Sequence, residues 1–193
     1  QGRRMQGQDK GLIERQGRPM IAHIVDALAD DADEVLISCN RNQAHYAQFG
    51  RTLIDTIAGF PGPLAGVLSG LEAARNSQLL IVPCDNPQPP PTLFAKLSYG
   101  AQQTGIRFAY DGQRDQYLYA LIPRAEAGSL RDYLDRGQRS VQGWYAERGA
   151  QAADEARPVL VAHEQHVAFE LGLHDGVVHL HQARLAAEDG AGG

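Results

Sequence analysis

The stretch LLIVPCDNP, residues 79–87, decides the fold of this chain. Its first four residues are all large and apolar, which is typical of a strand that is buried on both faces, as in a parallel sheet. Prolines at positions 83 and 87 then stiffen the backbone on either side of Asp85. In open α/β sheets, ligands bind beyond the carboxyl ends of the strands. We therefore expect a buried strand that brings a carboxylate to a ligand site.

Short apolar runs and segments of helical periodicity alternate on both sides of this strand. The pattern predicts further strands at residues 35–38, 52–54, 106–110 and 117–122, and helices at 19–29, 62–75, 93–99 and 125–136. Such alternation is typical of an α/β fold with a mostly parallel sheet flanked by helices. Two further strands also end in polar residues, the first in Ser38 and Asn40 and the second in Asp55.

Length and composition indicate one globular domain over residues 1–193, because 21.0 kDa with 43% hydrophobic and 21% charged residues is ordinary for such a domain. A net charge of −5 argues against a broad nucleic-acid or anionic-membrane surface. No apolar run approaches the roughly 20 residues of a membrane span, and no secretory signal is visible, so we expect a cytoplasmic protein. Cys39 and Cys84 lie far apart and are expected to be free thiols.

The first 18 residues are basic and rich in glycine although the protein as a whole is acidic. They contain five basic residues against two acidic ones, and Lys10 follows a loop that holds Gly2 and Gly7. Backbone amides together with a lysine are the groups that hold polyphosphate in proteins. The Walker pattern is absent, so a solvated basic loop is the alternative to a phosphate site.

Asp85 suits a magnesium ion, because Mg²⁺ takes one or two protein carboxylates and completes its shell with water and substrate phosphates. The alternative is that Asp85 or Asn86 forms an Asx turn or a helix cap. The glycine-rich segment PGPLAG at 61–66 allows close backbone approach to a ring or a phosphate, or is a plain turn. Together, the basic loop, this turn and Asp85 predict a nucleoside triphosphate site with a metal.

Five motifs in this order resemble the molybdenum cofactor guanylyltransferases. They are RMQGQDK at 4–10, GRPM at 17–20, SCNR at 38–41, PGPLAG at 61–66 and PCDNP at 83–87, and GQRSV at 137–141 is similar to a later family segment. The resemblance implies a Rossmann-like nucleotidyltransferase fold of the nucleotide-diphospho-sugar transferase type. It implies transfer of GMP from GTP to the phosphate of molybdopterin, with release of pyrophosphate and with Mg²⁺ as cofactor.

The resemblance also implies roles for single residues. Lys10 contacts the phosphates of GTP, Arg4 lies beside it at the reacting phosphates, and Asp85 binds both Mg²⁺ and GTP. The remaining matched positions contact the nucleotide, at Ser38, Asp55, Pro63, Leu64 and Gly66. Arg139 lies toward molybdopterin. The expected partners are GTP and molybdopterin, with transient contact to proteins that make or accept the cofactor.

The chain departs from the family pattern at both ends. The family has an apolar strand and a Leu-Ala-Gly-Gly turn before the arginines, so we expect the native protein to extend upstream of Gln1. Without that strand, a central position of the sheet is expected to be unpaired. In the tail, 163–193, VAFELG at 167–172 replaces an asparagine-containing segment of the family. This tail contains five histidines, at positions 163, 166, 174, 179 and 181. We expect them to lie on the surface and to have no catalytic or metal-binding role.

These departures leave two alternatives to guanylyl transfer. One is a related enzyme that transfers a cytidylyl group to the same pterin or a nucleotidyl group to a sugar phosphate. The other is a nucleotide-binding adaptor whose catalysis is weakened. The nucleotide preference of the purified protein distinguishes the first alternative from guanylyl transfer. GTP binding without pyrophosphate release would indicate the second.

Overall fold

The computed structural model describes residues 9–55, 62–84, 86, 88–99, 105–153 and 177–181. Within these residues the main sheet has seven strands. In spatial order they are β4 (Arg51–Leu53), β3 (Glu34–Ser38), β9 (Val177–His181), β5 (Gln78–Pro83), β7 (Asp115–Pro123), β6 (Arg107–Tyr110) and β8 (Gln151–Ala152). Each strand expected from the sequence is present, and the α/β class with helices beside the sheet is confirmed.

The sheet is mixed in direction. β3 pairs with β4 in parallel and β6 pairs with β8 in parallel, whereas β9 and β7 run antiparallel to the strands on both of their sides. Five described strands therefore point one way and two point the other way. β5 is apolar on both faces as expected, yet both of its neighbours are antiparallel. A continuous apolar run indicates that both faces of a strand are buried. It does not indicate whether the neighbouring strands run parallel or antiparallel to it.

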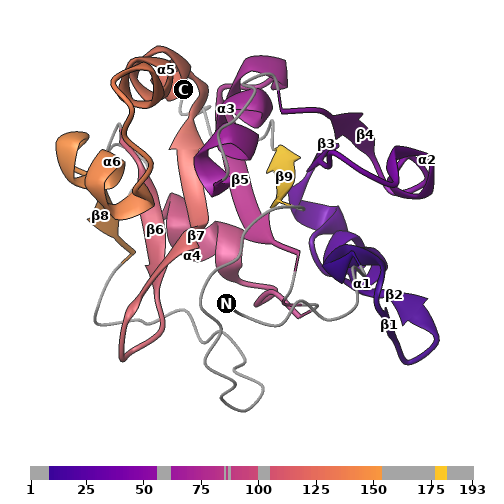
Figure 1. Cartoon of the computed structure of the whole chain (residues 1–193). Coiled ribbons are helices and arrows are strands. Elements are labelled where there is room, and N and C mark those ends of the chain that lie inside the picture. The colour runs from indigo at the N-terminus through magenta and orange to yellow at the C-terminus, as the bar shows by residue number, and fades with distance from the viewer. Residues whose placement is uncertain are drawn as a thin grey trace, which may run out of the picture.

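Alternate residues of β3, β5 and β7 contribute to two hydrophobic cores, one on each face of the sheet. In β5, Leu80 and Val82 pack into the first core, and Leu79 and Ile81 pack into the second. Two groups of helices cover these cores, so that the sheet lies between them (Figure 1). The first core is covered by α1 (Met20–Ala27), α2 (Gln43–Tyr46) and α4 (Leu93–Ser98), and the second by α3 (Pro63–Ala73), α5 (Ala127–Asp135) and α6 (Val141–Glu147).

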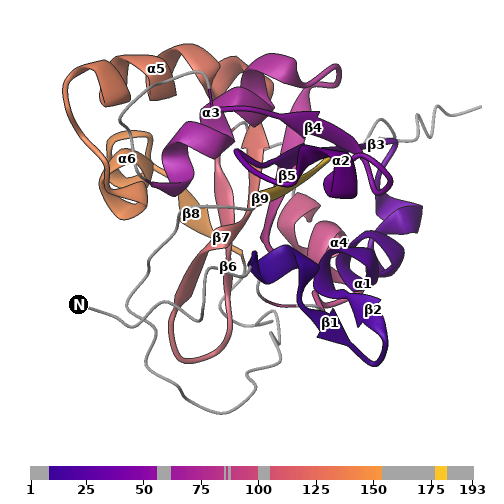
Figure 2. The same ribbon diagram turned by 45° about the vertical axis from the view of Figure 1, so that its right-hand side comes forward.

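β9 occupies the central position of the sheet that was expected to be unpaired. It pairs along five residues with β3 on one side and along five residues with β5 on the other, and it lies between them in both ribbon views (Figures 1 and 2). The expectation of an unpaired position is therefore wrong, because a segment of the tail supplies the missing backbone partners. His179 and His181 belong to β9, and the other three tail histidines lie outside the described residues.

The short elements were not expected from the sequence. β1 (Glu14–Arg15) and β2 (Arg18–Pro19) form a hairpin whose two turn residues, Gln16 and Gly17, have φ values of 52° and 76°. Both residues are in the left-handed region, as in the type I′ turn that is common in two-residue hairpins. Single 3₁₀ turns form η1 (Lys10–Leu12), η2 (Ala29–Asp31) and η3 (Arg124–Glu126).

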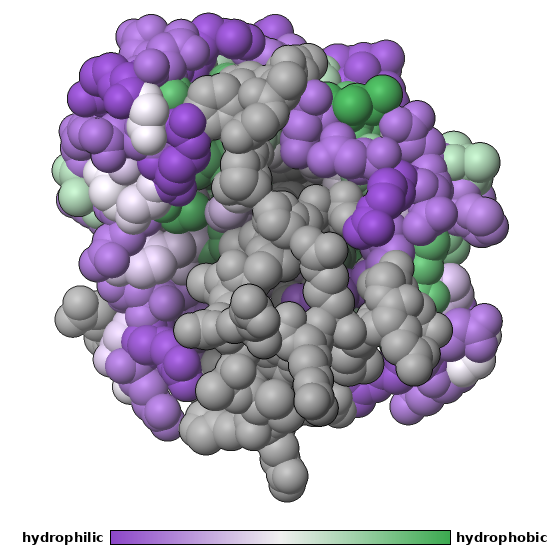
Figure 3. All heavy atoms as spheres, in the orientation of Figure 1, coloured by the Kyte–Doolittle hydropathy of each residue, from purple (hydrophilic) through white to green (hydrophobic). Residues whose placement is uncertain are grey.

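Few large hydrophobic side chains are exposed among the described residues. On the face shown in Figure 3, most described residues are hydrophilic and the hydrophobic ones appear in small, separate areas. Among the described residues, the exposed large hydrophobic side chains are Ile54 and Tyr99. None of the helices in the described ranges is long and apolar enough to cross a membrane.

Candidate active site at the carboxyl edge of the sheet

Three strands end at the same edge of the sheet. β3 and β4 are parallel, and β3 and β5 run in the same direction because both are antiparallel to β9. Ser38 is the last residue of β3, Asp55 follows β4 by two residues, and the buried Cys84 directly follows β5. Asp85 and Arg4, which the sequence singled out, lie outside the described residues. The edge is the place where a ligand of an α/β sheet is expected.

A hydrogen-bonded cluster at this edge brings Ser38, Asn40 and Asp55 together. Ser38 Oγ donates to Asp55 Oδ1 at 3.1 Å, and Asn40 Nδ2 donates to Asp55 Oδ2 at 2.9 Å. The backbone N–H of Asp55 donates in turn to Asn40 Oδ1 at 3.1 Å. Asn40 thus holds residue 55 at two points, and both carboxylate oxygens are oriented by donors from the end of β3. We call these three residues the Asp55 cluster.

The first turns of α3 pack directly against the Asp55 cluster. A Cβ at Gly66 would lie 2.9 Å from Ser38 Oγ and 3.8 Å from Asp55 Oδ1, so a glycine is needed for this close approach. Pro63 begins the helix, where its missing N–H has no helical partner to lose. Leu64 is 1% exposed, and its side chain belongs to the second core. The Asp55 carboxylate therefore lies beside the first turn of α3.

The segment that carries Lys10 is held at the same edge by Tyr46 of α2. Tyr46 is 1% exposed and lies in the first core together with Cys39 and Cys84, which directly follow β3 and β5. Its hydroxyl donates to Asp9 Oδ1, and Gly11 packs against its ring. Burial, followed by the hydrogen bond to Asp9, raises the pKa of the Tyr46 hydroxyl above its ordinary value of 10.0, so the group stays a donor at neutral pH.

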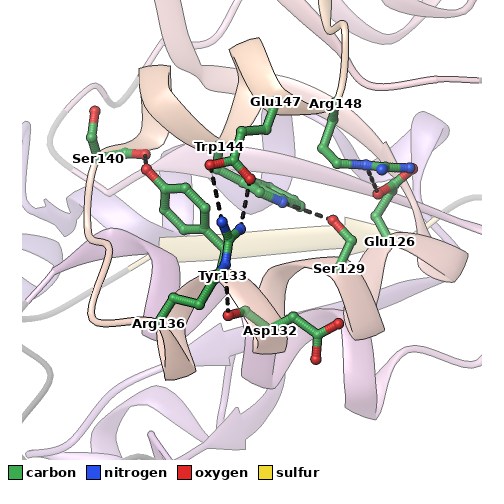
Figure 4. Close-up of polar contacts among 9 residues, drawn as sticks. All are labelled: Glu126, Ser129, Asp132, Tyr133, Arg136, Ser140, Trp144, Glu147 and Arg148. Carbon is green, nitrogen blue, oxygen red and sulfur yellow. Dashed lines mark hydrogen bonds and ion pairs between the residues drawn. The ribbon is translucent and has the colours of Figure 1, made fainter.

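Arg139 lies in the turn between α5 and α6. Its Nη1 donates to the carbonyl oxygen of Leu134, the second-to-last residue of α5, at 3.0 Å. The turn is held by Tyr133, whose hydroxyl donates to the carbonyl oxygen of Ser140 at 3.0 Å (Figure 4). Arg136 and Glu147 form an ion pair at 2.6 Å across the two helices. In this structure the guanidinium of Arg139 helps to close the carboxyl end of α5.

Comparison with known proteins shows the family of this chain. A family model described as the MobA-like NTP transferase domain matches residues 1–163. The molybdenum cofactor guanylyltransferase of Shewanella frigidimarina (strain NCIMB 400) is 40% identical over 148 residues, which cover 75% of this chain and 76% of that protein. The chain belongs to the molybdenum cofactor guanylyltransferase family.

Two further comparisons agree with membership of the molybdenum cofactor guanylyltransferase family. The enzyme of that name from Shewanella sediminis (strain HAW-EB3) is 38% identical over 155 residues, or 79% of each protein. The crystal structure of molybdopterin-guanine dinucleotide biosynthesis protein A from Archaeoglobus fulgidus aligns with a TM-score of 0.62 over 78% of this chain and 77% of that one, at 16% identity. That likeness concerns the fold, and it confirms the nucleotidyltransferase architecture.

In this member of the guanylyltransferase family, the carboxylate that is expected to hold magnesium, Asp85, lies outside the described residues. The described ranges contain no group of three or more His, Cys, Asp or Glu side chains that could hold a metal ion. A magnesium ion needs no such group, because it binds through one or two carboxylates plus substrate phosphates. The carboxylate of Asp85, next in the chain after Cys84, fits this donor chemistry.

Sequence reasoning identified some of the residues that meet at this edge and missed others. Ser38 and Asp55 were found because they follow predicted strands, and the structure brings them together. Asn40 was noted at the same strand end, but its two bonds to residue 55 were not foreseen. Asp9 and Tyr46 carried no signal, because residues separated by 37 positions are joined only by the fold.

Proposed function

We propose that this chain transfers GMP from GTP to the phosphate of molybdopterin, forming the dinucleotide cofactor and releasing pyrophosphate. The observation that supports this most is the 40% identity, over 148 residues, with a protein named molybdenum cofactor guanylyltransferase. In the reaction an oxygen of the molybdopterin phosphate forms a bond to the α-phosphorus of GTP. The bond from that phosphorus to the α–β bridging oxygen breaks, and its electron pair leaves with pyrophosphate.

The proposed chemistry depends on alignment and charge, and it needs no strong base. A phosphate monoester, with a second pKa of about 6, is already largely ionised at neutral pH. Catalysis then consists of holding the two phosphates in line and of neutralising the charge that develops on pyrophosphate. Cations and backbone amides perform this work in phosphoryl-group transfer.

We assign the residues as follows. Lys10 and Arg4 bind the phosphates of GTP and absorb the charge of the leaving group. Ser38 and Asp55 contact the nucleoside, and Pro63, Leu64 and Gly66 form the turn beside guanine. Arg139 faces molybdopterin. The cluster geometry supports the nucleoside assignment, because Ser38 and Asp55 hold each other and abut Gly66.

Magnesium belongs to this proposal as the cofactor, and Asp85 would hold it. When bound, Mg²⁺ neutralises phosphate charge and orients the phosphates of the nucleotide. The expected partners are GTP and molybdopterin as substrates, together with proteins that supply or accept the cofactor.

The test is direct synthesis. The purified protein is incubated with GTP, Mg²⁺ and molybdopterin, and the dinucleotide and pyrophosphate are measured, with CTP replacing GTP in a parallel reaction. We expect equal amounts of both products with GTP and far less with CTP. Product with CTP alone would support cytidylyl transfer, and GTP binding without pyrophosphate release would support an adaptor; either result overturns the proposal.

The two lysines of the chain provide a matched pair of variants. Lys10→Ala removes the proposed phosphate ligand, and Lys96→Ala removes the other lysine, which lies in α4. We expect Lys10→Ala to lower kcat/KM for GTP by at least about a hundredfold, whereas Lys96→Ala stays within about twofold of the wild type. Asp85→Ala should abolish transfer and leave the far-UV circular dichroism spectrum unchanged. Wild-type turnover by either Lys10→Ala or Asp85→Ala would contradict these assignments.

A further inference from the structure

Asp9 is a buried carboxylate that accepts hydrogen bonds from two residues much later in the sequence. It is 7% exposed. Tyr46 donates its hydroxyl to Asp9 Oδ1 at 2.5 Å, and Asn42 Nδ2 donates to Asp9 Oδ2 at 3.3 Å. Burial of a carboxylate is unfavourable unless donors replace its lost water. Asn42 is the N-cap of the short helix α2 and Tyr46 is its last residue, so the Asp9 side chain fixes the start of η1 to that helix.

Gly11 fixes the same segment from the other side of Lys10. A Cβ at Gly11 would lie 2.5 Å from the Tyr46 hydroxyl oxygen and 3.1 Å from Tyr46 Cε1, so the backbone rests against the phenol ring. The turn is closed by the N–H of Leu12, which donates to the carbonyl oxygen of Asp9 at 3.1 Å. The residues before and after Lys10 therefore touch one phenol, and the backbone of Lys10 is held between them.

The phenol itself is anchored at the edge where the candidate site lies. Tyr46 packs in the first core beside Cys39 and Cys84, the residues that directly follow β3 and β5. Because its pKa is raised by burial, Tyr46 keeps its proton and remains a donor to Asp9 throughout the physiological range. The Lys10 segment is thus tied to the ends of two central strands through a single buried ring.

We propose that Asp9, Tyr46 and Asn42, which we call the Asp9 clamp, are positioning residues that hold Lys10 ready for the phosphates of GTP. This inference rests on the proposed role of Lys10. A lysine has a long, flexible side chain, and fixing its backbone before binding reduces the freedom that is lost when the ammonium group engages a phosphate. None of the three clamp residues needs to touch the nucleotide, because the clamp acts through Lys10.

The test compares the effect of removing the Tyr46 hydroxyl in the wild-type protein and in the Lys10→Ala variant. Tyr46→Phe deletes the donor to Asp9 and keeps the ring against Gly11, and the dissociation constant for GTP with Mg²⁺ is measured by calorimetry. We expect Tyr46→Phe to weaken GTP binding by about tenfold in the wild-type background and by less than about twofold in the Lys10→Ala background. A positioning role predicts this loss of effect, whereas a purely structural role predicts equal effects in both backgrounds.

Tyr145→Phe is the matched control. Tyr145 is also a buried tyrosine, 2% exposed, and its hydroxyl donates to the carbonyl oxygen of Tyr117 at 3.1 Å in the second core. We expect Tyr145→Phe to lower the melting temperature and to leave GTP affinity within about twofold of the wild type. Equal weakening of GTP binding by Tyr145→Phe and Tyr46→Phe would overturn the clamp.

Asn42→Gly provides a second variant in case Tyr46→Phe does not fold. Asn42 has a φ of 54°, which glycine adopts without strain, so this change removes the amide donor and preserves the backbone. We expect about threefold weaker GTP binding, which again disappears in the Lys10→Ala background. If Lys10→Ala itself leaves GTP affinity unchanged, the proposed phosphate role fails and the clamp fails with it. If Lys10→Ala weakens binding but neither clamp variant does, only the clamp is wrong.

Discussion

The Asn40 amide takes part in two of the three hydrogen bonds of the Asp55 cluster. It donates to Asp55 Oδ2 and accepts from the Asp55 N–H, whereas Ser38 makes one bond to the same carboxylate. A side-chain amide can do this because it carries a donor and an acceptor on one plane. The orientation of Asp55 therefore depends on a residue that need not contact the nucleotide.

This dependence predicts which of two substitutions at position 40 lowers the stability of the protein more. Asn40→Ala removes both bonds and should lower the free energy of unfolding by about 1–2 kcal/mol. Asn40→Asp keeps the acceptor but turns the donor into a carboxylate facing Asp55, so repulsion should make it less stable than Asn40→Ala. Urea unfolding at pH 7 measures both variants. If Asn40→Asp matches the wild type, the contact between positions 40 and 55 is not as described.

Gly66 and Gly128 offer a comparison between two helical glycines. A Cβ at Gly66 meets Ser38 Oγ at 2.9 Å, whereas a Cβ at Gly128 in α5 meets nothing within 4 Å. Gly128→Ala should stabilise the protein by about 0.5–1 kcal/mol and leave GTP binding unchanged. Gly66→Ala should push the Ser38 hydroxyl away from Asp55 and weaken GTP binding by about fivefold. Thermal unfolding and calorimetry test both, and equal GTP affinities for the two variants would contradict the close contact.

The sequence predicted the candidate site only where a local pattern marked it. Ser38 and Asp55 follow apolar runs, so their position at the strand ends could be expected, and they meet in the structure. Asp9 was counted only as one of the two acidic residues of the basic segment, and no pattern in the sequence assigned a role to Tyr46. Their contact depends on how α2 packs, and no periodicity in either segment reports that packing.

The sequence predicted those helices and strands whose apolar pattern is long enough to show a periodicity. The helices of α3 and α5 and the strands β5 and β7 were found within a few residues of their observed bounds. The two-residue strands β1, β2 and β8 are too short to show alternation. β9 was missed for another reason, since its segment was assigned to a tail that differs from the family pattern.

The central place of β9 predicts a specific sensitivity to proline. A residue in this strand has hydrogen-bonded neighbours on both sides, β3 and β5, so a missing N–H leaves a carbonyl in the sheet without its donor. Val178→Pro should lower the melting temperature by roughly 3–10 °C more than Val178→Ala, which keeps the N–H. Equal melting temperatures would show that residues 177–181 do not pair in the sheet.

At the scale of the whole molecule, two buried tyrosines make the free energy of unfolding depend on pH in the alkaline range. Burial raises the pKa of Tyr46 and of Tyr145 above the ordinary value of 10.0. Each raised pKa contributes stability that is fully present below pH 10, where the unfolded phenol is still protonated. Above pH 10 the unfolded state releases protons that the folded state retains, so this stability is lost as the pH rises toward the folded pKa.

We therefore expect the free energy of unfolding to show no tyrosine-dependent loss between pH 7 and pH 9 and to fall above pH 10. Each of the two residues contributes up to about 1.4 kcal/mol per pH unit. Tyr145→Phe should reduce the slope above pH 10 without changing the pH at which the decline begins. Urea unfolding from pH 7 to pH 11 measures this, and an unchanged slope in Tyr145→Phe would contradict the buried, protonated state of that phenol.

The reversed strand in the middle of the sheet also affects when the molecule can fold during synthesis. β3 and β5 are made early, but the strand that joins them comes from residues 177–181. Because a chain emerges from the ribosome starting at its N-terminus, at about 5–20 residues per second, the two halves of the sheet wait for several seconds without a common neighbour. During that interval the nascent chain exposes two unpaired strand edges, and these are the surfaces that chaperones would have to shield.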